Sequence, residues 1–174
     1  MSHRDLITEW FEQYSNDVYN FLVYYCGSKD VHDLVQETFI RATRGIKKFR
    51  YDSNPKTWLF SIARNIAIDQ ARKKKRQIQS SSVAFDETYM GESSNNPESQ
   101  LIENERVRYI YQQMMTLRRN YREVLILRGI EGMSIKETAE ILDWTESKVK
   151  QTFYRARKAL QKRLNGKGEI SYGS

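Results

Sequence analysis

The chain has 174 residues, of which 39% are hydrophobic and 29% charged, and its net charge is +7. No run approaches the roughly 18 to 20 apolar residues that span a bilayer. A single cysteine, Cys26, excludes an internal disulfide framework, and with two prolines and eight glycines an all-β fold is disfavoured. The first residues are charged where an export signal needs an apolar stretch. We therefore expect an all-α, cytoplasmic protein, with Cys26 as a small core residue.

Charge divides the chain into three segments. Residues 1–76 hold 14 basic and 9 acidic residues, residues 101–174 hold 15 and 9, and residues 77–100 hold four acidic residues and no basic ones. The middle segment also has six serines and few apolar residues, so it cannot bury enough surface to offset the entropy of ordering it. We predict two small helical domains, 1–76 and 101–174, joined by a flexible acidic linker over 77–100. Two basic blocks favour a polyanionic partner.

Three amphipathic helices are expected in the first block. Apolar residues recur at intervals of three and four over residues 7–25 and again over residues 35–46, as one face of a helix requires. A third helix is expected from about Thr57, just after Pro55, and should end in the cationic run 72–76. The residues expected to face the core are Ile7, Phe11, Tyr14, Val18, Phe21, Tyr25, Val35, Phe39, Ala42, Ile46, Trp58, Leu59, Ile62 and Ile66.

Two helices joined by a short turn are predicted near the end of the second block, after helices over about 101–117 and 120–130. Ser134 is a natural N-cap, and Glu137 three residues later completes a capping box. The turn falls at Asp143 and Trp144, and Thr145 caps the next helix. A second helix rich in Lys and Arg is typical of a helix-turn-helix motif.

The outer face of that last helix carries residue types that bind DNA. Cations there can pair with phosphates or with guanine acceptors, and a glutamine can pair with adenine. The candidates are Lys150, Gln151, Tyr154 and Arg155. The alternative is a solvated basic helix on an ordinary bundle.

The loop after the second helix combines aromatic and basic side chains, which can stack on and neutralise single-stranded bases. Phe49 and Tyr51 are the candidates for base contact, beside Arg50 and Lys56, whereas Trp58 is expected in the core. The cationic run 72–76 can bind a polyanion, or it can be a solvated helix end with no binding role.

Asp33, Gln36 and Glu37 lie on one polar helix face without a histidine or metal-ligand partner. A solvated face or a docking face for another protein is therefore favoured over acid–base chemistry. His3 and His32 are expected to be surface residues. No catalytic residue, metal site or cofactor is predicted, so the chain is not expected to be an enzyme.

Two segments resemble a known family. The sequences HDLVQETFIRA at 32–42 and KKFRYDSNPKTWLFSIARNIAIDQARKKKR at 47–76 are similar to region 2 of extracytoplasmic-function (ECF) bacterial sigma factors. Residues 117–160 are similar to region 4 of the same family. The resemblance covers both basic blocks and omits the acidic segment.

This resemblance implies a function and partners. The protein would bind core RNA polymerase, through the clamp helices of the largest subunits and the flap of the second largest, and direct initiation at promoters. Asp33, Gln36 and Glu37 would contact the polymerase, and the last helix would read the −35 element through Lys150, Gln151, Tyr154 and Arg155. The residues assigned by the resemblance to the −10 element and its melting are Phe49, Arg50, Tyr51, Asn54, Lys56, Ser61, Arg64, Asn65, Arg72 and Lys73. An anti-sigma factor, often membrane-bound, is the expected regulator.

The chain departs from the family pattern at two places: Leu117-Arg118 replaces a common Leu-Pro, and Ser147-Lys148 replaces a common Gly-Thr. Two other functions also fit parts of the sequence. One is a stand-alone helix-turn-helix regulator whose first block senses a signal or dimerises. The other is an interaction adaptor that does not bind nucleic acid.

Overall fold

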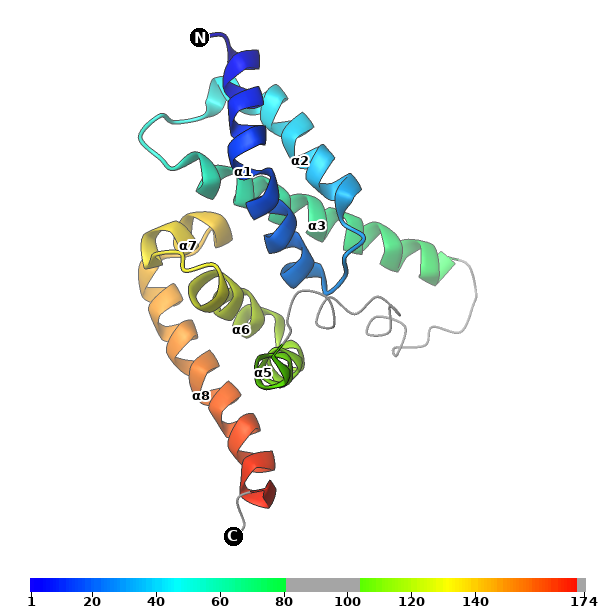
Figure 1. The fold of residues 1–174 in the computed structure, drawn as a ribbon, viewed down its shortest axis with the longest axis vertical. Helices are drawn as coiled ribbons and strands as arrows, with labels where there is room; N and C mark the ends of the chain where they lie inside the picture. Colours follow the sequence, from blue (N-terminus) through cyan, green and yellow to red (C-terminus); the bar gives the residue numbers. More distant parts are fainter. Residues whose placement is uncertain (81–103, 172–174) are drawn as a thin grey trace. The chain divides into compact units, whose positions relative to one another are not determined.

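The computed structural model describes residues 1–80 and 104–171 and shows only helices, turns and loops there (Figure 1). The all-α prediction is confirmed for these residues. The chain divides into two compact units, Met1–Pro97 and Glu98–Ser174. Most of the predicted linker, residues 81–100, lies outside the described residues.

The N-terminal unit consists of α1 (His3–Cys26), α2 (His32–Gly45), a 3-10 turn (Ile46–Lys48) and α3 (Pro55–Ser80). A reciprocal capping box between Ser2 and Asp5 starts α1, and its hydrogen bonds lower the pKa of the Asp5 carboxyl. Gly27 ends α1 with φ 69°, a left-handed conformation that suits glycine.

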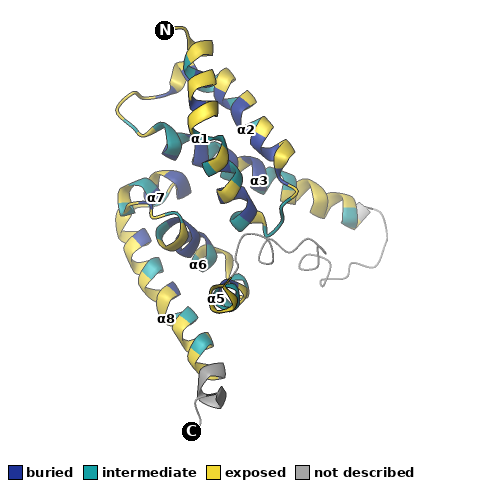
Figure 2. Ribbon diagram, in the orientation of Figure 1, coloured by how far each residue is buried: buried dark blue, intermediate teal, exposed yellow. Residues whose placement is uncertain are grey.

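The three long helices of this unit pack against one another around an aromatic and aliphatic core (Figure 2). Phe21 and Phe60 are fully buried and stack with ring centroids 4.6 Å apart. The predicted apolar stripe of α1 is wrong at Phe11, which is 46% exposed, while Trp10 is buried. α1 contacts both α2 and α3, so its buried face is wider than the single predicted stripe and includes the neighbouring position.

Two boundaries differ from the sequence-based expectation. α3 begins at Pro55, which supplies the first helical position, and continues through Ser80, four residues into the predicted linker. Cys26 is exposed at the end of α1 rather than in the core.

The C-terminal unit consists of α5 (Glu105–Met115), α6 (Arg119–Val124), the π-helix η3 (Leu125–Ile130), α7 (Ile135–Leu142) and α8 (Glu146–Ser171). α8 packs against α5, α6, η3 and α7. The helix predicted over 120–130 is present, but its second half widens into π-helix: the amide of Glu131 donates to the carbonyl of Ile126 at 2.9 Å.

The helix-turn-helix prediction is confirmed in its local geometry. The amide of Glu137 donates to Ser134 Oγ at 3.0 Å, which makes Ser134 the N-cap of α7. Asp143 ends α7 with φ 57°, and the amide of Lys148 donates to Thr145 Oγ1 at 3.1 Å at the start of α8.

Candidate nucleic-acid interface

α8 presents a polar and basic face to the outside. Val149 and Ala156 are fully buried and fix the rotation of the helix about its axis. The four candidates for the −35 element, Lys150, Gln151, Tyr154 and Arg155, are all exposed. Because they occupy one helical face, they are available together to the major groove of a duplex.

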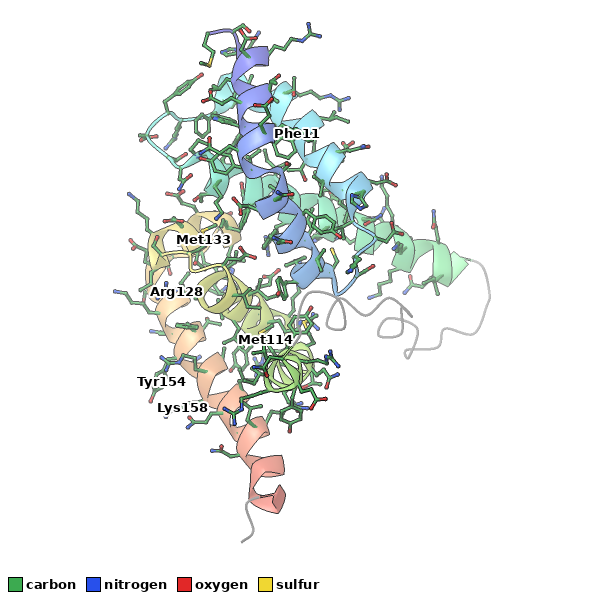
Figure 3. All side chains as sticks on the ribbon, in the orientation of Figure 1. Phe11, Met114, Arg128, Met133, Tyr154 and Lys158 are labelled. Carbon is green, nitrogen blue, oxygen red and sulfur yellow. The ribbon has the colours of Figure 1, made fainter. Side chains whose placement is uncertain are left out.

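Cations packed on aromatic rings organise the surroundings of this face. Lys158 Nζ lies 4.6 Å from the ring centroid of Tyr154, which is 60% exposed (Figure 3). Lys148 Nζ lies 4.3 Å from the ring centroid of Trp144 in the preceding turn. Each contact holds a flexible cation near the face that the helix presents.

A buried aromatic cluster supports the loop between α2 and α3. The Phe49 ring lies 4.9 Å from Trp10 of α1 and 5.1 Å from Trp58 of α3. Tyr51 contacts the Phe49 edge at 5.3 Å and is itself 68% exposed.

This arrangement bears on the predicted base contact of Phe49. The residue is only 6% exposed, so its ring is covered in this conformation. Aromatic partners from α1 and α3 hold it inside, and Trp10, which sequence reasoning missed as a partner, closes one side. Tyr51 remains the aromatic side chain of this loop that a base can reach.

The loop itself is fixed by local hydrogen bonds. Both the amide and the hydroxyl of Ser53 donate to the carbonyl of Arg50, at 3.0 and 3.1 Å. Asn54 Oδ1 accepts from the amide of Lys56 at 3.0 Å, so Asn54 caps α3. Lys56 Nζ lies 3.8 Å from Asp17 of α1 and 5.6 Å from the Phe60 ring centroid. The Asn54 and Lys56 side chains thus have structural partners, whereas the Arg50 side chain is exposed.

The remaining −10 candidates lie along α3. Asn65, Arg72 and Lys73 are exposed, whereas Ser61 and Arg64 are half-buried. The Ser61 hydroxyl donates to the carbonyl of Trp58 at 2.6 Å, so it is engaged within the helix.

The polar face of α2 is exposed at Asp33 and Gln36. Glu37 is half-buried and accepts from Arg41 Nε at 3.3 Å, and Arg41 Nη1 reaches Asp69 of α3 at 3.4 Å. The carboxylates therefore share a helix face without converging on a common reacting point, which suits docking better than catalysis.

Comparison with known proteins identifies the family. Residues 10–77 match the model of Sigma-70 region 2, and residues 108–160 match that of Sigma-70, region 4. The ECF RNA polymerase sigma factor SigX of Bacillus subtilis is 38% identical over 157 residues, which cover 88% of this chain and 81% of that protein. The chain belongs to the ECF sigma factors.

Other relatives agree with this assignment. ECF RNA polymerase sigma factor SigM of Bacillus subtilis is 36% identical over 162 residues, covering 91% of this chain and 95% of SigM. The sigma factor RpoE of Bartonella quintana, solved in complex with the anti-sigma factor NepR, superimposes with a TM-score of 0.69 at 27% identity. That likeness covers 91% of this chain and 96% of the solved one.

Within residues 1–80 and 104–171, no helix has the length and apolar character needed to cross a bilayer. In the same ranges, no group of three or more His, Cys, Asp or Glu side chains is placed to hold a metal ion.

Proposed function

We propose that this ECF sigma factor binds core RNA polymerase and directs initiation at promoters, with α8 on the −35 element and the α2–α3 loop and α3 on the −10 element. One observation carries the proposal. Two separate helical units match the two promoter-reading regions of the family, in the family's order, and each exposes basic side chains where DNA is expected.

At the −35 element, Lys150 and Arg155 neutralise phosphates or bond guanine, and Gln151 pairs with adenine. Tyr154 adds apolar contact with a base edge. Their common exposure on α8 supports simultaneous contact within one major groove.

At the −10 element, Tyr51 stacks on an unpaired base of the non-template strand, and Asn65 and Arg50 contact the same strand. Stacking on an aromatic ring is worth about 1–3 kcal/mol per base, enough to offset much of the cost of unpairing one. Phe49 positions Tyr51 from inside the domain. Arg72 and Lys73 bind the adjacent phosphates. The site is bordered by four further residues, Asn54, Lys56, Ser61 and Arg64.

Docking on the polymerase uses the α2 face, with Asp33 and Gln36 directly and Glu37 through its pair with Arg41. The α2 face binds the clamp helices of the largest subunits, and the C-terminal unit binds the flap of the second largest subunit. Because each unit alone offers a small interface, the polymerase must fix both at the promoter spacing before DNA binding becomes tight.

An anti-sigma factor is the proposed regulator. The structural relative from Bartonella quintana was solved with such a partner. We further propose that the chain works in the cytoplasm and forms no covalent intermediate. Binding energy alone drives strand separation, since the site needs only to stabilise an unpaired base.

Reconstitution tests the proposal. Purified chain and core enzyme are expected to initiate transcription from a set of promoter fragments of the source genome, whereas either component alone does not. Glu37→Lys should weaken association with core enzyme, and Glu140→Lys, an exposed acid on α7, is the matched charge control. Absence of initiation on every fragment would overturn the proposal.

A stand-alone regulator makes the opposite prediction. It should shift duplex promoter DNA without polymerase and should not need Tyr51. An adaptor should be indifferent to both Lys150→Ala and Arg155→Ala. Permanganate footprinting of the −10 region separates these outcomes, because only a sigma factor with core enzyme exposes unpaired thymines there.

A further inference from the structure

The Arg128 side chain contacts both the loop that precedes α7 and helix α8. It lies in the π-helix η3, and its Nη1 donates to the carbonyl of Met133 in the loop before α7 (Figure 3). Its guanidinium carbon also lies 5.2 Å from the ring centroid of Phe153 in α8. One side chain therefore contacts the segment that leads into α7 and the helix that presents the DNA-contacting face.

Holding Arg128 there has a cost. Its Nε is buried without a hydrogen-bond partner, and burial of an unpaired polar group is unfavourable. Arg128 also lies in a π-helix, a rare arrangement that occurs mostly as single turns and frequently at functional sites. A buried unpaired donor within such a turn points to a role for this side chain beyond stability.

The two contacts set the geometry of recognition. Met133 directly precedes Ser134, the N-cap of α7, so fixing the Met133 carbonyl fixes where α7 begins. Phe153 directly precedes Tyr154, and its ring centroid also lies 5.6 Å from the guanidinium carbon of Arg157. A shift of this ring would rotate the exposed face of α8 relative to α7.

We propose that Arg128 is a positioning residue for −35 recognition, which sets the angle of α8 on the duplex without touching DNA. The proposal rests on the function proposed above. A planar guanidinium can donate to a carbonyl and pack on a ring at once, whereas an ammonium is a compact, hydrated charge. Lysine should therefore not replace it.

The test uses holoenzyme with two templates in one tube, an active promoter and the same promoter with a scrambled −35 element. The ratio of the two transcripts is the readout, because a smaller active fraction lowers both transcripts equally. Arg128→Met and Arg128→Lys should each lower the ratio about tenfold, as expected when a base contact is lost.

Arg122→Met is the matched control. Arg122 is also half-buried and donates through Nη1 to a backbone carbonyl, that of Met115 at 3.3 Å, at the end of α5. It should keep the ratio within about twofold of the wild type. An unchanged ratio in Arg128→Lys, or an equal loss of both transcripts, would overturn the proposal.

Phe153→Leu tests whether Arg128 acts on α8 through the Phe153 ring. It keeps apolar bulk and removes the ring, so it should lower the ratio by itself, and combining it with Arg128→Met should lower the ratio no further. Additive losses would overturn action through Phe153. If the wild type itself fails to initiate, the proposed function fails instead, so the two failures are distinguishable.

Discussion

The two units are stabilised in different ways. In the N-terminal unit, long helices bury rings against rings, as in the cluster of Trp10, Phe49 and Trp58. In the C-terminal unit, short helical segments pack on the long helix α8 around an aliphatic core. Side-chain caps, cations on rings and a buried carboxylate, Glu123, paired with Arg119 at 3.4 Å, contribute there as well.

This difference suits the two proposed tasks. A packed aromatic base can hold a loop rigid while a strand is separated, because tightly packed cores resist deformation. Polar caps instead place helix ends at defined points, which a helix entering a duplex groove requires. Substitutions that act on packing should therefore be most damaging in the first unit, and substitutions of polar groups should matter more in the second.

The largest effect is expected from Phe60→Ala. Phe60 is fully buried and stacked on Phe21, so its truncation should lower the unfolding free energy by about 3–5 kcal/mol. Urea unfolding followed by fluorescence in a Trp144→Phe background measures this, because Trp10 and Trp58 then report on the first unit alone. Phe11→Ala, at a ring 46% exposed, should cost about 1 kcal/mol. Equal losses would contradict the packing argument.

Arg155→Ala comes next. Loss of this exposed cation from α8 should weaken −35-dependent binding of the holoenzyme by about 1–3 kcal/mol without changing thermal stability. Competition between intact and scrambled promoters measures it. Lys162→Ala, an exposed cation further along α8, provides the control. If both variants lose the same binding, the contact is only general charge attraction.

Ser134→Ala tests how much the N-cap of α7 stabilises the second unit. Removing the acceptor for the Glu137 amide should cost about 1 kcal/mol of stability. Thermal unfolding followed by Trp144 fluorescence, in a background in which Trp10 and Trp58 are replaced by Phe, measures it. The comparison is Ser147→Ala, at an exposed site in the first turn of α8. A cost no larger than that of Ser147→Ala would show that α7 begins without help from its cap.

The last prediction concerns the reactivity of the Cys26 thiol, for which we expect the smallest effect on function. Burial around its thiol raises the pKa to about 11, although the residue as a whole is exposed. The thiol stays protonated well above neutral pH, and any stability linked to its neutral form is lost only as pH rises from about 9 towards 11. Iodoacetamide should alkylate native Cys26 at pH 9 about tenfold more slowly than the unfolded chain. Equal rates would contradict the raised pKa.

The sequence by itself determined the elements that depend on local patterning. Helical periodicity predicted the all-α fold, and Ser134 and Thr145 marked the starts of α7 and α8, because caps act within one helical turn. The exposed face of α8 was predictable for the same reason: Val149 and Ala156 must turn inward, and the basic residues then turn outward.

Only the tertiary structure decided which aromatic residue of the α2–α3 loop is accessible. Phe49 and Tyr51 look equivalent in sequence, but Trp10, some forty residues earlier, covers Phe49 and leaves Tyr51 outside. Arg128 was invisible for a related reason: its partners, Met133 and Phe153, come together only when η3, the next loop and α8 pack. Contacts between distant segments depend on how helices dock, and periodicity within one helix carries no record of that.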